Sequence, residues 1–171
     1  IKLVQIIVLI INCMKNIKKI KCSNFSVLSK RKIKYVIIHY TNMNNQKSAI
    51  KRLQSRVAKV SCHYIVSKKG KVYRMVNDKD VAWHAGKSKW KQDKNLNNCS
   101  IGIELINNGN EAFPNKQIIS LIKLLKKIIT KYEIKINNVL GHSDISPGRK
   151  FDPGPLFPWS KIRQNKTLKK A

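Results

Sequence analysis

The segment from Pro114 to Glu133 constrains the fold of this chain more than any other. Its apolar residues recur three and four positions apart, which is the period of a helix with one apolar face. A single helix cannot bury such a face alone, so another layer of structure has to cover it. The apolar positions are Ile118, Leu121, Ile122, Leu125, Ile128, Ile129 and Tyr132.

Five short runs rich in apolar and β-branched residues are candidates for that second layer, because they read as strands. Two of them flank residues 67–70 and predict a hairpin whose turn is made by Gly70. A further helix is predicted over residues 48–57, with Ser48 as its cap and Val57 on its apolar face. Mixed strands and helices in 171 residues predict a single α/β domain. The five runs are residues 35–38, 63–66, 71–76, 100–106 and 139–140.

The charge of the chain is extreme, with 36 Lys and Arg against 8 Asp and Glu and a formal net charge of +28. This excess favours anionic partners such as a nucleic acid, an anionic membrane or an acidic polymer. The alternative is drift in base composition, because the excess is mostly Lys and accompanies much Ile and Asn, which share A- and T-rich codons. No helix-turn-helix, zinc-finger or RNA-binding motif is present in the sequence, so we expect no nucleic-acid partner.

The first 33 residues differ from the rest of the chain. An almost wholly apolar stretch ends at Cys13, and a strongly basic stretch follows it. This order resembles a bacterial lipoprotein signal, in which the cysteine is lipidated. Asn12 stands where a small residue is usual, and a start of translation at Met14 is the alternative. The apolar stretch is shorter than the roughly 20 residues that a membrane span requires.

Two histidines, His39 and His142, each follow a predicted buried strand. Sites in open α/β sheets form beyond the ends of strands. Two imidazoles and one carboxylate make the three-ligand set of a catalytic zinc, which keeps its fourth position open. Asp144 and Asp152 are the candidates for the carboxylate, and the spacing alone leaves both open.

Glu104 interrupts the apolar run of residues 100–106. In a strand it shares one face with Gly102 and Ile106. It is either a solvent-facing residue on a one-sided sheet or a carboxylate beside the metal. In the second case it could take a proton from water and pass it to a leaving amine.

Five motifs in order identify a resemblance that covers residues 34 to about 162. The chain resembles the zinc-dependent N-acetylmuramoyl-L-alanine amidases of the amidase-2 class, which are related to AmpD and to peptidoglycan-recognition proteins. The interval between the third and fourth motifs and the end of the fifth resemble the AmiD branch, whose members are envelope lipoproteins. The motifs are VIIHYT, VSCHYIV, AWHAGKSKW, LNNCSIGIELIN and GHSDISPGRKFDPGPLFPW.

The resemblance implies one zinc ion held by His39, His142 and Asp152, with Glu104 and Lys150 as catalytic residues. It implies a central mixed β-sheet flanked by helices. It also implies contacts between substrate and a second set of residues in the cleft, for which packing inside the fold is the alternative. That second set is His63, Trp83 and His84.

The function implied is hydrolysis of the amide bond between N-acetylmuramic acid, or its 1,6-anhydro form, and L-alanine of the peptidoglycan stem peptide. The sugar form and the stem-peptide length stay open. A non-catalytic peptidoglycan-binding module is the alternative. Such a module would be expected to lack a zinc ligand, but the three implied ligands and the two implied catalytic residues are all present.

We expect a monomer that binds peptidoglycan fragments on the periplasmic side of the cell envelope, attached through Cys13, with the cytoplasm as the alternative. The expected division is a leader (1–33), a catalytic domain (34–165) and a basic tail (166–171).

Overall fold

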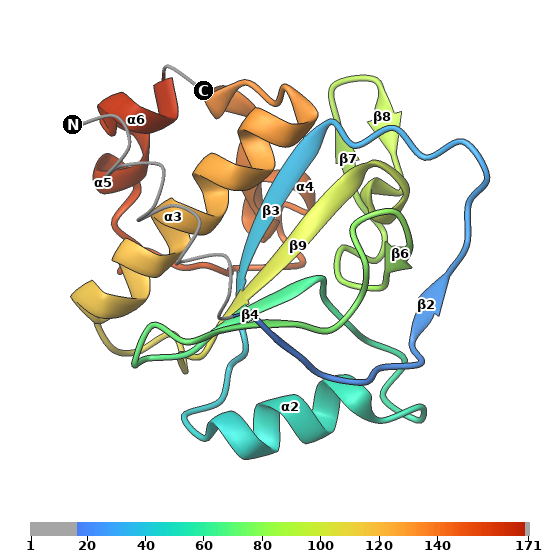
Figure 1. Cartoon of the computed structure of the whole chain (residues 1–171), viewed down its shortest axis with the longest axis horizontal. Coiled ribbons are helices and arrows are strands. Elements are labelled where there is room, and N and C mark those ends of the chain that lie inside the picture. The colour runs from blue at the N-terminus through green and yellow to red at the C-terminus, as the bar shows by residue number, and fades with distance from the viewer. Residues whose placement is uncertain (1–16, 170–171) are drawn as a thin grey trace, which may run out of the picture.

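A computed structural model describes residues 17–169 and shows a six-stranded mixed sheet with helices on both faces (Figure 1). Four neighbouring strands are parallel, β5 is antiparallel to β4, and β1 is parallel to β5. The predicted single α/β domain with a central mixed sheet is thereby confirmed. In spatial order the strands are β1 (Lys18–Lys19), β5 (Val72–Arg74), β4 (Tyr64–Val66), β9 (Ser100–Leu105), β3 (Tyr35–Tyr40) and β10 (Val139–Gly141).

The long predicted helix is α3 (Asn115–Tyr132), and it covers one face of the sheet. Its apolar stripe, which includes the fully buried Leu121 and Leu125, packs on Val36 and Ile103. Two short helices, α5 (Trp159–Arg163) and α6 (Lys166–Lys169), pack beside it on the same face. The helix and its partner layer therefore follow the sequence prediction.

The opposite face of the sheet is covered by α2 (Gln46–Gln54), which lies on the other side in Figure 1. The helix begins two residues before the predicted start, because the Asn45 side chain and not Ser48 caps it by accepting from the Ser48 backbone N–H. It ends before Val57, which is 91% exposed, so the predicted extension of the helix to residue 57 is wrong. The predicted hairpin is present, with Gly70 at a φ of +80°.

Smaller elements complete the fold, and the sequence patterns did not indicate most of them. Two antiparallel pairs lie outside the main sheet, β2 with β6 and β7 with β8. The helix α4 and the 3₁₀ turn η1 pack on the sheet face that α2 also covers. Their bounds are β2 (Phe25–Ser26), β6 (Val81–Ala82), β7 (Lys89–Trp90), β8 (Asp93–Lys94), η1 (Leu96–Cys99), η2 (Ile136–Asn138) and α4 (His142–Ile145).

The described part of the predicted leader, residues 17–33, lies on the domain. It supplies the edge strand β1, and Ile33 is buried in the core beneath α3. At the other end, Leu168 of the predicted tail is buried in the same core. Packing therefore extends past both expected boundaries, residues 34 and 165. Cys13 lies outside the described residues, and within 17–169 we find no helix of the length and hydropathy that crossing a membrane requires.

Candidate metal centre

The candidate site lies on the sheet face opposite α3, where polar side chains separate two apolar clusters. Strand alternation explains this placement. Ile101, Ile103 and Leu105 of β9 point into the core under α3, so Gly102 and Glu104 face the other way.

Three ligand atoms converge at one end of this face. The Nδ1 atom of His39 lies 2.8 Å from Oδ2 of Asp152 and 3.0 Å from Nδ1 of His142. The distance from His142 Nδ1 to Asp152 Oδ2 is 3.1 Å. These three residues are the group within residues 17–169 that could hold a metal ion, and all three are buried. Two imidazole nitrogens and one carboxylate oxygen thus converge on one point.

The topology explains how residues far apart in the chain meet there. Strands β3 and β10 are parallel, with Ile38 opposite Gly141, so His39 and His142 lie at the same edge of the sheet. The loop after α4 then returns, and the Ser143 backbone N–H donates to the carbonyl of Asp152. The peptide bond between Asp152 and Pro153 is cis.

Asp144 does not join this cluster. Its carboxylate is exposed and accepts a hydrogen bond from the Gly141 backbone N–H, at 2.7 Å, at the start of α4. Of the two aspartates that spacing left open, Asp152 is therefore the one that lies at the histidines.

The Nε2 atoms of His39 and His142, which point away from Asp152, each contact another group of the protein. Nε2 of His39 lies 3.0 Å from Nδ1 of His84, and Nε2 of His142 lies 3.0 Å from the carbonyl oxygen of Ala85. Burial lowers the pKa of His39 to about 4; the contact with Asp152 opposes this shift, and the neighbouring His142 and Lys150 add to it. His39 is therefore neutral at pH 7, which is the form that binds metal ions.

Glu104 lies directly beside His39 in the β3–β9 ladder. It is partly buried, and its Oε2 atom is enclosed with no hydrogen-bond partner. Burial raises the pKa of Glu104 to about 8; the charge of Asp152 acts in the same direction, and Lys150 opposes it. A carboxyl group with a pKa near neutrality is suited to proton transfer.

Lys150 is partly buried on the returning loop, two residues before Asp152. Its positive charge contributes to lowering the pKa of both His39 and Glu104. The ammonium group is therefore within electrostatic range of both, on the chain segment that carries the aspartate.

The three residues expected to contact substrate lie mainly inside the fold. His63 is fully buried; its Nδ1 accepts from the Gly102 N–H, and its Nε2 lies 3.1 Å from the Asp80 carbonyl oxygen. His84 is 8% exposed, and Trp83 is half-buried with its indole N–H donating to Ser26. For His63 the structure favours the packing alternative, since the imidazole offers no surface to a ligand.

Sequence reasoning missed several residues that support the site. Ser100 contacts His84, and a Cβ atom at Gly102 would overlap the His84 ring. Both share the Glu104 face of β9, so strand alternation within SIGIE was the signal that could have found them. Arg149 donates to the carbonyls of Ala85 and Lys87 and to the Ser146 hydroxyl beside His142.

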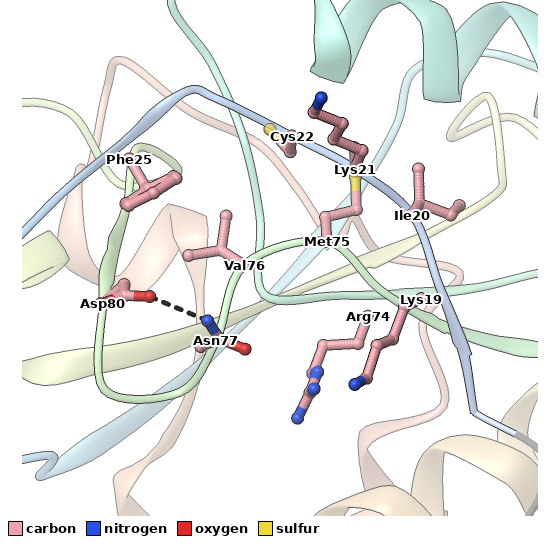
Figure 2. A pocket seen from close by; sticks show the side chains of 10 residues that line it. All are labelled: Lys19, Ile20, Lys21, Cys22, Phe25, Arg74, Met75, Val76, Asn77 and Asp80. Atoms are coloured by element: carbon pink, nitrogen blue, oxygen red, sulfur yellow. Dashed lines mark hydrogen bonds between the residues drawn. The ribbon is translucent and has the colours of Figure 1, made fainter.

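A separate pocket of about 310 Å³ lies at the far edge of the sheet, between β1 and the end of β5 (Figure 2). The basic side chains of Lys19, Lys21 and Arg74 and apolar ones such as Met75 line it. None of the predicted site residues contributes to it. This pocket is therefore separate from the histidine cluster.

Two histidines and an aspartate that converge beside a carboxyl group of raised pKa are typical of metal-dependent hydrolases. The comparison with protein families is consistent with that class. The chain belongs to the Amidase_2 family, described as N-acetylmuramoyl-L-alanine amidase, whose family model matches residues 29–155.

Individual relatives agree with the family. The chain is 41% identical over 149 residues to N-acetylmuramoyl-L-alanine amidase AmiD of Escherichia coli K12, which covers 78% of this chain and 53% of that protein. It is 38% identical over 104 residues to 1,6-anhydro-N-acetylmuramyl-L-alanine amidase AmpD of Haemophilus influenzae, which covers 60% and 56% of the two chains. This chain therefore spans about half the length of these relatives.

A solved structure shows the same fold. It is the complex of E. coli AmiD with the substrate anhydro-N-acetylmuramic acid-L-Ala-D-γ-Glu-L-Lys, and it matches with a TM-score of 0.73 and 39% identity. The match covers 81% of this chain and 60% of that one. The predicted resemblance to the AmiD branch is confirmed.

Proposed function

We propose that this protein is a zinc-dependent amidase that hydrolyses the bond between N-acetylmuramic acid, or its 1,6-anhydro form, and L-alanine of the stem peptide. One observation carries the proposal: the ligand atoms of His39, His142 and Asp152 converge within 3.1 Å of one another beside Glu104. The names of the AmiD and AmpD relatives support the substrate class.

The donor set fits zinc. Zinc–ligand distances of about 2.0–2.1 Å place tetrahedral ligand atoms roughly 3.3 Å apart. The observed separations of 2.8–3.1 Å need only a small outward movement of the side chains to match this value. A bound zinc ion would polarise the amide carbonyl and make water a better nucleophile at neutral pH.

Glu104 would move the proton. Its carboxyl group would take a proton from the attacking water and deliver it to the nitrogen of L-alanine, because an amine leaves only after protonation. The enclosed, unpartnered Oε2 and the raised pKa suit a group that changes protonation state during a reaction.

Lys150 would stabilise the negative charge that develops on the lactyl carbonyl oxygen. Preorganised groups of this kind contribute about 3–4 kcal/mol to transition-state binding. Its position beside Asp152 supports this role, since the loop that brings the ligand also brings the cation.

The test is digestion of anhydro-muropeptides and, separately, of intact sacculi, with mass spectrometry of the products. Release of the intact stem peptide from the sugar supports the proposal, and the substrate cut faster identifies the preferred sugar form. Binding of either substrate by zinc-loaded protein without cleavage would favour the non-catalytic module instead.

For the location, we propose a lipid anchor at Cys13 that holds the protein at the periplasmic side of the envelope. The apolar run that ends at Cys13 supports this, and stable attachment needs more than one acyl chain. Metabolic labelling with a palmitate analogue tests it. An unlabelled cytosolic product that starts at Met14 would contradict it.

We also propose that the protein acts as a monomer, because one chain supplies all five proposed zinc and catalytic residues. Light scattering of the zinc-loaded protein measures its mass. A stable dimer whose dissociation abolishes cleavage would contradict the proposal.

A further inference from the structure

Behind the metal ligands, a chain of hydrogen bonds runs from His39 through the interior to the turn η1. Its far end is the carbonyl oxygen of Leu96, which lies 2.5 Å from the Ser100 hydroxyl. A carbonyl oxygen can only accept, so the single hydroxyl proton of Ser100 has to point at Leu96. The direction of the chain is therefore fixed at this end.

The next contact joins Ser100 to His84. Nε2 of His84 lies 3.3 Å from Oγ of Ser100. Since the hydroxyl proton is already used, Oγ can only accept here, and Nε2 of His84 has to carry a proton. In a neutral imidazole the other nitrogen, Nδ1, then carries a lone pair.

The third contact reaches the metal ligand. Nδ1 of His84 lies 3.0 Å from Nε2 of His39, so the lone pair on His84 requires the proton of His39 to be on Nε2. Nδ1 of His39 is thereby left with a lone pair, and this is the atom that faces Asp152 and His142.

A single contact fixes the tautomer of His142. Its Nε2 lies 3.0 Å from the carbonyl oxygen of Ala85 and has to donate to it, so its Nδ1 also presents a lone pair. Asn97 holds the segment that carries both His84 and the Ala85 carbonyl, because its Oδ1 accepts from the backbone N–H groups of His84 and Ala85 at 3.0 and 2.7 Å. Both orienting groups are thus held by the turn η1.

The packing around His84 leaves its ring no freedom. The ring lies over Gly102, where any Cβ would overlap it, and His84 is 8% exposed. A ring held in this way cannot rotate to exchange its two nitrogens without displacing β9.

We propose that Ser100 and His84 are positioning residues that hold the proton of His39 on Nε2, with the Leu96 carbonyl as the fixed end, and so keep the Nδ1 lone pair directed at the metal. This inference rests on the proposed zinc site. Groups that orient metal-binding histidines in this manner typically contribute 10–100-fold to metal affinity.

The first test is Ser100→Ala, which removes the acceptor and lets His84 adopt either tautomer. We expect its zinc dissociation constant, measured by chelator competition, to rise about 10–100-fold. Ser67→Ala is the matched control, because Ser67 is a buried serine whose hydroxyl accepts from the Lys71 N–H away from the histidines. A folded Ser100→Ala protein with wild-type zinc affinity would overturn the proposal.

A second pair of variants places side chains of similar shape at position 84 that differ from each other in the acceptor. His84→Asn places an oxygen where Nδ1 lies, whereas His84→Leu places a methyl group there. We expect Asn to retain more zinc affinity than Leu, and equal affinity in the two variants would contradict the role of His84 as an acceptor.

The third test reads the tautomer directly and separates this inference from the proposed function. Nitrogen-15 NMR of the zinc-free wild-type protein at about pH 9, well above the ordinary pKa of imidazole, should show His39 protonated at Nε2 alone. A proton on Nδ1 would overturn the inference even if zinc binds. Failure of the wild type to bind zinc would instead overturn the proposed function, and the NMR result would still decide the tautomer.

Discussion

Two aspartates of this protein are buried to the same extent, 8% exposed each, and yet their surroundings differ in one respect. Asp78 is surrounded by proton donors: the Tyr64 hydroxyl on one oxygen, and the Tyr132 hydroxyl and Lys131 ammonium on the other, at 2.8 and 3.0 Å. The neighbours of Asp152 are the Nδ1 atoms of two histidines, at 2.8 and 3.1 Å, and the proposed tautomers place the proton of each imidazole on Nε2 instead.

This difference separates a carboxylate that stabilises the fold from a candidate metal ligand. A buried carboxylate needs either donated protons or a cation. Asp78 has its donors, whereas the contacts of Asp152 leave a position that a metal ion would complete. Burial alone would have placed both residues in one class.

The largest effect is expected from Asp152→Asn, which keeps the shape of the side chain and removes the negative ligand. Zinc content should fall from about one per chain to near zero and cleavage should fall with it, because a catalytic zinc needs three protein ligands. If both histidines carry their protons on Nε2 as proposed, the free energy of unfolding of the zinc-free protein should not fall, because no donor loses its acceptor. Metal analysis and urea denaturation measure the two quantities, and full zinc retention would refute the ligand assignment.

Next in size are Glu104→Gln and Lys150→Ala, which test groups beside the metal. Each should lower kcat about 10²–10³-fold with zinc content unchanged, because proton transfer and oxyanion stabilisation act on the transition state. Steady-state cleavage of a muramoyl tripeptide with parallel zinc assays gives both values. A change confined to KM would indicate substrate binding only.

Asp78→Asn is the counterpart of the Asp152 variant. We expect it to lower the free energy of unfolding by about 2–3 kcal/mol, because an amide cannot accept from three donors and leaves buried groups unpaired. Zinc content should stay near one per chain. Urea denaturation of both aspartate variants side by side checks this, and equal stability losses in the zinc-free proteins would remove the distinction between the two aspartates.

The smallest effect concerns pH. Burial acts to raise the pKa of Asp78, but hydrogen bonds from Tyr64, Tyr132 and Lys131 outweigh it and lower the pKa. A lowered folded-state pKa stabilises the protein above the unfolded value of about 3.9, and this contribution is lost as the pH falls through the folded-state value. The stability difference between wild type and Asp78→Asn should therefore shrink below about pH 4. A difference that stays constant from pH 7 to pH 3 would contradict it.

Much of this arrangement could be predicted from sequence. The period of residues 114–133 predicted α3, and the position of His39 and His142 at the ends of predicted strands indicated where they meet, although β3 continues through His39 to Tyr40. The choice between Asp144 and Asp152 could not be made from spacing, because it depends on how a loop returns. The family resemblance supplied Asp152, and the structure places it at the histidines.

Other parts of the site depend on contacts that no local pattern encodes. The acceptor that orients His142 is the backbone carbonyl of Ala85, and the fixed end of the chain behind His39 is the carbonyl of Leu96. Backbone atoms carry no sequence signature, so such roles appear only when the chain is folded. Two-residue strands such as β1 are likewise too short to give a period.

The parallel pairing of β3 with β10 also affects when the site forms. His142 and Asp152 are 10 positions apart in the chain, but His39 is 103 positions from His142. Closing so long a loop is among the slow steps of folding, because its entropy cost comes before its contacts form. The complete ligand set then exists only once the sheet has assembled. Bound zinc would therefore mainly slow the unfolding of the folded protein, and it would contribute little to the rate of folding.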